Sequence, residues 1–312
     1  MIAEVKSYDA RYFKQWNQLI AQSNHATFML DRNFMEYHQE RFQDASIVLV
    51  DADEKLIACL PANRVADKIY SHQGLSYGGF VFSPKLTIEK KMTAYRKGFE
   101  FYKKQGMHSL VYKALPPYYH KEEHQAIDLI ARLGGSLVNR ETSSVVDLQQ
   151  EKTYQKRRKR MIARALKQGL KVETTDQLTR FWAVLEANLL KRYQKAPVHT
   201  LEEISLLANR FPKHIKLIQA TYEEQVVGGM LLFDSNPCVH AQYIASNEIG
   251  RQYGALDLIV DAIIDQYKLT HRYFSLGISD DRQSQTINKG LKEWKDGFGA
   301  RDFYHSYYQY QF

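Results

Sequence analysis

Residues 238–299 carry the clearest pattern of apolar and polar positions in the chain. Residues 239–245 predict a strand, and the glycines that punctuate residues 247–254 predict a loop after it. An amphipathic helix is expected from about Ala255, because apolar residues recur there at spacings of three and four. These apolar residues are Leu256, Ile259, Val260, Ile263 and Ile264.

The same order of elements is predicted in both halves of the chain. In the second half we expect strands at 171–173, 215–220, 226–233, 239–245, 273–278 and 303–312, and helices at 177–194, 201–211, from 255, and around Asn288 to Lys295. In the first half we expect strands at 3–8, 46–50, 56–61, 108–112 and 138–148, and helices from Asp9, at 30–42 with Asp31 as N-cap, at 87–105 and at 122–133. Each half therefore fits one α/β domain.

Composition narrows the class of protein. The chain has 312 residues, is 44% hydrophobic and is 25% charged, which is typical of a soluble globular protein with a sizeable core. Its two cysteines, Cys59 and Cys238, form no disulfide framework and no metal-ligand spacing, so we expect no metal site. With no signal peptide and no apolar run near bilayer length, we expect a cytoplasmic protein.

The net charge of +8 is concentrated in residues 152–171, which include the run 156–160 of lysines and arginines. This segment favours a helix that Gly169 could cap. Two interpretations stay open at this point. The helix could be a solvated linker, or its cations could bind an anionic substrate, a phosphate chain or RNA.

The junction before the helix at Ala255 is a candidate phosphate site. The first amides of a helix lack internal partners, and the helix dipole is positive there. Gly254 would let a phosphate approach the backbone, and Arg251 would add a charge. We therefore assign cofactor binding to Arg251, Gln252, Tyr253, Gly254 and Ala255. The alternative is that the glycines only shape a turn and that Arg251 is an ordinary surface charge.

Three segments, taken together, resemble one known family. They are residues 74–80 (GLSYGGF), the basic helix with residues 157–173, and residues 294–299 (WKDGFG). In this order they resemble the Fem-like branch of the tandem GNAT acyltransferases, which includes the peptidoglycan bridge aminoacyl transferases. The resemblance implies an α/β (α+β) fold of two tandem GNAT domains, each a mixed twisted sheet flanked by helices.

The resemblance also implies an organisation and an activity. Residues 1–150 would form an acceptor-side domain, 151–170 a basic linker helix, and 171–312 a donor-side domain. The enzyme would be an N-acyltransferase that moves an acyl or aminoacyl group from acyl-CoA or charged tRNA to a primary amine, without a covalent intermediate. We place acyl transfer from acyl-CoA first and aminoacyl transfer second. The alternative is a non-catalytic binder of an anionic cell-wall precursor or of RNA.

The resemblance also suggests catalytic residues. Lys295 would stabilise the negative charge of the tetrahedral intermediate, and an irregularity in the strand at 240–245 would expose a backbone amide to the thioester carbonyl. Tyr243 or Tyr307 could protonate the leaving group, and His240 could act as a base. Each has a plain alternative: a solvated lysine, packed tyrosines and a structural histidine.

We assign acceptor binding to Tyr77, Gly78, Asp280 and Asn288. The loop at 74–80 could instead need glycine only for its backbone path, and Asp280 with Asp281 could cap the following helix. The expected acceptor is a small-molecule or cell-wall-precursor amine, and charged tRNA is a possible partner. Acyl-CoA is expected as a co-substrate, with no permanently bound cofactor.

Overall fold

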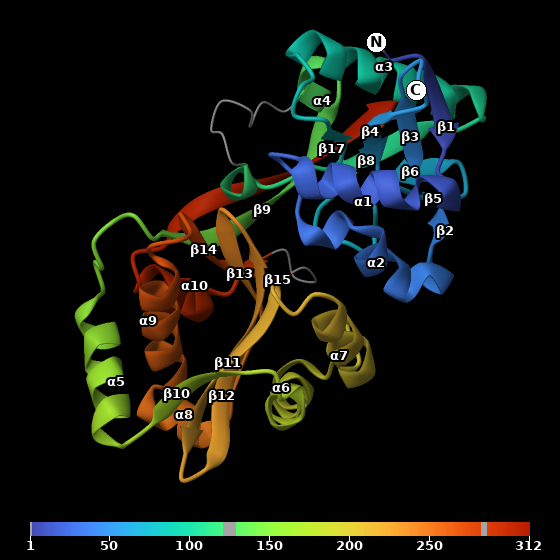
Figure 1. The fold of residues 1–312 in the computed structure, drawn as a ribbon. Helices are drawn as coiled ribbons and strands as arrows, with labels where there is room; N and C mark the ends of the chain where they lie inside the picture. The colour runs from blue at the N-terminus through green and yellow to red at the C-terminus, as the bar shows by residue number, and fades with distance from the viewer. Residues whose placement is uncertain (1, 121–128, 282–285) are drawn as a thin grey trace. The chain divides into compact units, whose positions relative to one another are not determined.

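The computed structural model describes residues 2–120, 129–281 and 286–312 (Figure 1). Contacts between Cα atoms divide the chain into two compact units. Unit 1 comprises Met1–Glu141 and Tyr304–Phe312, and unit 2 comprises Thr142–Phe303. These limits differ from the boundaries expected at residues 150 and 170, because residues 304–312 belong to unit 1 and the basic helix belongs to unit 2.

Unit 1 has short strands and two long helices. Its strands are β1 (Glu4–Ser7), β2 (Gln43–Asp44), β3 (Ile47–Val50), β4 (Leu56–Leu60), β5 (Asn63–Val65), β6 (Lys68–Tyr70), β7 (Val81–Phe82) and β8 (Ser109–Lys113). Its helices are α1 (Phe13–Gln22), α2 (Arg32–Met35), α3 (Ile88–Lys104) and α4 (Leu129–Arg132), with 3₁₀ turns η1 (Ala10–Tyr12), η2 (Phe28–Leu30), η3 (Glu36–Arg41) and η4 (Pro117–Tyr119). Strands β9 (Ser136–Asp147) and β17 (Arg301–Gln311) each begin in one unit and end in the other.

The strands of unit 1 fall into two groups. One sheet has the order β1-β3-β4-β7 and is antiparallel throughout. In the other group β17, β8, β6, β5 and β2 are successive neighbours, and β6 pairs with β8 in parallel. A core of aliphatic and aromatic side chains, including Phe80, Tyr95 and Phe99, packs between these strands and α3.

Unit 2 contains the longer strands. Its strands are β10 (Lys171–Thr175), β11 (Ile215–Tyr222), β12 (Gln225–Ser235), β13 (Cys238–Ser246), β14 (Tyr273–Ile278), β15 (Asp280–Asp281) and β16 (Thr286–Ile287). Its helices are α5 (Lys156–Lys167), α6 (Leu178–Tyr193), α7 (Leu201–Arg210), α8 (Glu248–Tyr253), α9 (Ala255–Tyr267) and α10 (Lys289–Asp296).

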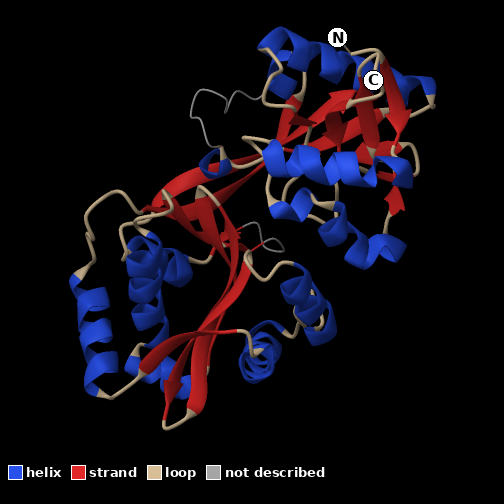
Figure 2. Ribbon diagram, viewed as in Figure 1, coloured by secondary structure: helices blue, strands red, loops and turns tan. Residues whose placement is uncertain are grey.

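A mixed sheet with the order β10-β11-β12-β13-β14-β9 runs through unit 2. Its pairings are antiparallel except for β13 with β14, which are parallel. Helices α5, α8 and α9 lie on one face of the sheet, and α6 and α7 lie on the other (Figure 2). The apolar stripe expected on α9 is confirmed, because Ile259, Val260 and Ile263 are fully buried in the core of this unit.

Three expected elements differ from the structure. The loop expected at 247–254 is helix α8, which begins because the Asn247 side chain accepts a hydrogen bond from the amide of Gly250. The helix expected over 30–42 does begin after Asp31, but it tightens to a 3₁₀ turn and breaks at His38. Most of the helix expected at 122–133 lies outside the described residues, and α4 forms its end. Within the described parts of the chain, no helix is long and apolar enough to cross a bilayer.

Candidate active site

Strands β13 and β14 pair over only three residues and then separate. Their rungs join Cys238 to Tyr273, Val239 to Phe274 and His240 to Ser275, whereas β13 continues to Ser246 and β14 to Ile278. We call this separation the fork. Backbone amides and carbonyls that face it have no partner on the opposite strand, so an extended ligand could pair with them.

A β-bulge lies on the β13 side of the fork. Leu231 of β12 is opposite Tyr243, but Leu232 is opposite Ala241, so Gln242 is an extra residue. The irregularity expected in residues 240–245 is therefore present. Because a bulge shifts the alternation of side chains by one, His240 and Tyr243 point to the same face of the sheet. Tyr243 packs edge-on against Trp182 of α6, on the face opposite to α9.

Lys295 of α10 lies at the end of β14. Its ammonium donates hydrogen bonds to the carbonyls of Gly277 and Ile278, at 2.9 and 2.6 Å. The side chain is only 2% exposed, so the solvated lysine that we considered above is excluded. Strand β14 is bulged here, because Leu276 and Gly277 both lie between the rungs that pair Ser275 and Ile278 with β9. Lys295 therefore binds two carbonyls at this bulge.

Burial lowers the pKa of Lys295 to about 7, with Asp280 and Asp296 opposing this shift and Lys292 adding to it. An amine with a pKa near neutrality exchanges its proton easily at physiological pH. Lys295 can therefore serve either as a cation beside a developing negative charge or as a proton carrier.

His240 lies on the last rung before the fork. Its Nδ1 is 3.0 Å from the hydroxyl of Ser275, which also accepts a hydrogen bond from the amide of Gly277. Burial and the nearby charge of Lys295 lower the pKa of His240 to about 4, so its imidazole is neutral at pH 7. A neutral imidazole fixed through Nδ1 can accept a proton at its other nitrogen.

Tyr243 is held by His199. The phenol oxygen is 2.6 Å from Nδ1 of His199 and accepts a hydrogen bond from the His199 amide. Burial raises the pKa of Tyr243 to about 12, so the phenol keeps its proton. The sequence offered no signal for His199, because it lies 44 residues from Tyr243 in a loop before α7.

The junction of α8 and α9 differs from the phosphate site expected there. Gly254 has a φ of +86°, and a Cβ there would lie 2.7 Å from the carbonyl oxygen of Met161 in α5. The glycine therefore permits close packing of α5, rather than the approach of a phosphate. Ala255 is fully buried, and Arg251 donates a hydrogen bond to the carbonyl of Ser246.

The first turn of α9 also carries a negative charge of its own. The carboxylate of Asp257 is buried there, where the helix dipole would otherwise favour an external anion. Tyr253 packs edge-on against Tyr222, and Gln252 is exposed. The cofactor-binding role of residues 251–255 stays a prediction, and these contacts give each buried member a structural role.

Two of the expected acceptor residues lie in unit 2, one after the end of β14 and one at the start of α10. Asp280 follows β14, and its side chain accepts a hydrogen bond from the amide of Thr142. Asn288 caps α10 by accepting from the amide of Leu291. Neither aspartate caps α10, which excludes the alternative role that we considered for them. The side chain of Asp281 lies outside the described residues.

The other two expected acceptor residues lie in unit 1 and are packed. Tyr77 is 3% exposed, and its hydroxyl donates to Thr27. A Cβ on Gly78 would lie 1.6 Å from the carbonyl oxygen of Ser71, so this position requires glycine for its backbone path. Their role in acceptor binding stays a prediction.

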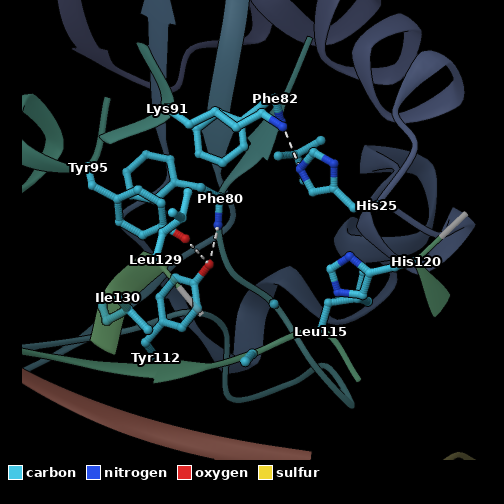
Figure 3. Close-up of a pocket in the computed structure, with 13 residues that line it drawn as sticks. His25, Phe80, Phe82, Lys91, Tyr95, Tyr112, Leu115, His120, Leu129 and Ile130 are labelled. Carbon is cyan, nitrogen blue, oxygen red and sulfur yellow. Dashed lines mark hydrogen bonds between the residues drawn. The ribbon is translucent and has the colours of Figure 1, made fainter. Parts of the chain in front are cut away.

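In unit 1, β7 and β8 belong to different sheets, and by the order of elements the gap between them is the counterpart of the fork. Aromatic side chains occupy this gap. The hydroxyls of Tyr95 and Tyr112 are 2.6 Å apart, and Tyr112 accepts a hydrogen bond from the amide of Phe80 (Figure 3). His25 and His120 line the other side of the small pocket that remains. Burial lowers the pKa of His25 to about 3, so its ring is neutral.

Among residues 2–120, 129–281 and 286–312, no group of three or more His, Cys, Asp or Glu side chains is arranged to hold a metal ion. Both cysteines are buried. Burial raises the pKa of each thiol above its usual range, which makes neither a nucleophile at neutral pH.

The sequence of unit 2 matches a known family. Residues 152–296 match the acetyltransferase (GNAT) domain. This part of the chain is similar to GNAT acetyltransferase domains. The fork and the bulge of β13 therefore lie in the part of the chain that matches the GNAT family, and this match supports an N-acyltransferase activity. No curated protein sequence matches the chain.

Solved structures share the fold of the whole chain. The crystal structure of FemX has a TM-score of 0.72 at 10% identity, covering 99% of this chain and 98% of FemX. L-PGS from Bacillus licheniformis has a TM-score of 0.62 at 9% identity, covering 98% and 92%. A tandem GNAT protein from the clavulanic acid pathway has a TM-score of 0.53 at 11% identity, covering 99% and 98%. The predicted tandem GNAT fold is confirmed, with FemX among its structural neighbours.

Because Gly254 contacts α5, adding a methyl group there should destabilise the fold more than adding one at a glycine in open space. We expect Gly254→Ala to lower the free energy of unfolding by about 2–4 kcal/mol, because it combines a positive φ with a backbone clash. Gly169→Ala is the matched control: its φ is +79°, but no atom lies within 4 Å of the added Cβ. Its cost should be about 1 kcal/mol. Equal costs in urea denaturation would contradict the close packing of α5.

The buried ammonium predicts how stability depends on pH. In the folded state the pKa of Lys295 is about 7, below its ordinary 10.5, so the unfolded chain binds more protons between these values. The contribution of Lys295 to stability therefore rises as pH increases from 7 to 10.5. From pH 7 to 9, wild type should gain about 1–3 kcal/mol relative to Lys295→Met. Parallel curves of unfolding free energy against pH would contradict the shift.

Proposed function

We propose that the chain is an N-acyltransferase that moves an acyl group from a thioester donor to a primary amine, with the fork of unit 2 as its active site. One observation carries the proposal: β13 and β14 separate beside a bulge, which leaves backbone groups to bind an extended donor. The donor's own amides would pair with β13 in the manner of an added strand. Its carbonyl would then lie at the bulge.

The chemistry needs alignment, a deprotonated amine and stabilisation of an oxyanion. The amine nitrogen attacks the thioester carbonyl, the C–S bond breaks, the amine loses one proton and the thiolate gains one. A backbone amide at the Gln242 bulge would donate to the oxyanion, and Lys295 would place its charge nearby. Tyr243, whose phenol keeps its proton, is the candidate proton donor to the thiolate.

Unit 1 is proposed as the acceptor side, because aromatic side chains occupy the gap where unit 2 has its fork. The proposed acceptor is the amine of a small molecule or of a cell-wall precursor. Acyl-CoA is the first candidate donor, and we propose a cytoplasmic reaction, where acyl-CoA is available.

A charged tRNA is the second candidate donor, and two observations favour it. The amino end of α9, where a donor pyrophosphate was expected, is closed by α5 and carries Asp257. Six exposed cations of α5 form no ion pair within the described parts of the chain and could bind a phosphate backbone. They are Lys156, Arg157, Lys159, Arg160, Arg164 and Lys167.

A thermal-shift panel tests the donor class, with acetyl-CoA, longer acyl-CoAs and charged tRNA as probes. A donor that binds only the folded chain at 100 times its Kd should stabilise it by about 2.7 kcal/mol, which raises Tm by several degrees. With the donor so identified, Lys295→Met should lower kcat by about 10²–10³. Lys289→Met, on the same helix but exposed, is the matched control and should retain activity. No shift with any thioester would overturn acyl-CoA as donor.

Salt dependence tests the tRNA alternative. Wild type should bind tRNA with a logarithmic affinity that falls steeply with salt concentration. Replacing Lys156, Lys159 and Lys167 with glutamine should reduce this slope by about 0.7–0.9 for each phosphate that the variant leaves unneutralised. The matched control replaces three exposed lysines of α3, Lys90, Lys103 and Lys104. Equal slopes in the two triple variants would contradict tRNA binding by α5.

A further inference from the structure

The residues just before α5 pack against the end of α10. The amide of Gln155 donates to the carbonyl of Gly297 at 2.9 Å. A Cβ on Gly297 would lie 2.9 Å from Cγ of Arg158, so the glycine makes room for the arginine stem. Gly299, at a φ of +80°, packs in the same way against the hydroxyl of Thr153. Two segments that the sequence presents as separate motifs are thus in direct contact.

Among the residues that the structure describes, Arg158 is the one cation of α5 that points into the core. Its guanidinium is 2.6 Å from the carboxylate of Asp257 in α9, and each side chain is only 7% exposed. Burial raises the pKa of Asp257 and lowers the pKa of Arg158. The attraction between the two charges opposes both shifts but does not cancel them. A buried ion pair of this kind is a weak source of stability, so a role in fixing geometry explains it better.

Asp257 also reaches α10. Its second oxygen accepts a hydrogen bond from Nε1 of Trp294 at 3.3 Å, and the Trp294 ring packs edge-on against Phe298. Trp294 precedes Lys295, and successive residues of an α-helix point about 100° apart. Fixing the direction of Trp294 therefore fixes the direction in which Lys295 leaves the helix.

We propose that Asp257, held by Arg158, is a positioning residue that acts through Trp294 to turn α10 so that the Lys295 ammonium reaches the end of β14. The inference rests on the proposed role of Lys295 at the fork. The proposal gives Arg158, the inward-facing cation of the basic helix, a role in positioning an active-site residue. This role differs from the phosphate binding proposed for the six exposed cations.

The physical need for such a device follows from the burial of Lys295. Taking an ammonium out of water is unfavourable, and its hydrogen bonds to two carbonyls compensate part of that cost. A small rotation of α10 would let the amine return to solvent. An anchor on the adjacent residue, tied to a rigid helix of the core, opposes that rotation.

Titration of Lys295 by NMR, with lysines labelled at Cε, tests the proposal without any substrate. The signal is assigned by its loss in Lys295→Met, and it should titrate near pH 7, where ordinary lysines do not. In Trp294→Phe, which keeps the aromatic packing but removes the N–H, we expect the midpoint to rise by about one pH unit or more. The double variant Arg158→Met/Asp257→Leu should do the same without leaving a buried charge unpaired.

Asp261→Asn is the matched control. Asp261 lies one turn further along α9 and binds Lys152 and Tyr154. It therefore joins α9 to the residues before α5, but among the described residues it makes no hydrogen bond to α10. It should leave the Lys295 midpoint unchanged, even if it lowers Tm. An unchanged midpoint in folded Trp294→Phe and in the folded double variant would overturn the positioning role. A shifted midpoint with unchanged kcat would uphold it and overturn the catalytic role of Lys295 instead.

Discussion

The separation of β13 from β14 is the constraint on which the rest of unit 2 depends. Parallel strands normally continue their hydrogen bonds to the end, so each strand here must have a reason to turn away. Gln242 supplies one as an extra residue in β13, and Leu276 with Gly277 supply the other in β14. The outer edges of both strands stay paired, to β12 and β9, which keeps the fork rigid while its inner edges are unpaired.

The bulge in β14 explains why a lysine is buried beside it. Buried carbonyls need hydrogen-bond donors, and Lys295 supplies one hydrogen bond to each of two carbonyls at the bulge. One residue thus satisfies the backbone at the fork and brings a charge of adjustable protonation to it. The basic helix α5 also has two roles. Arg158 packs inward against Asp257, while the other cations of α5 face solvent.

Periodicity in the sequence predicted the elements well where the apolar stripe was long, as in α9, and poorly where helices were short, as in α8. The bulge region and Lys295 came from a family resemblance, whereas His199 and Asp257 depend on interactions across 44 and 99 residues. Gly254 was assigned to a ligand because a glycine at a helix start can serve either a phosphate or a neighbouring helix. Only the packing of α5 distinguishes the two. Gly277 inside a buried strand did carry a local signal for a bulge.

The division of the chain has a consequence for its synthesis. Unit 2 is continuous in sequence, but unit 1 needs its last residues: β17 pairs with β8, and Tyr308 lies in the core. The amino-terminal unit therefore emerges first from the ribosome but is completed last, after the whole of unit 2 has been made. Until then the edge of β8 that β17 covers has no partner strand, so a nascent chain that stalls late exposes an aggregation-prone edge.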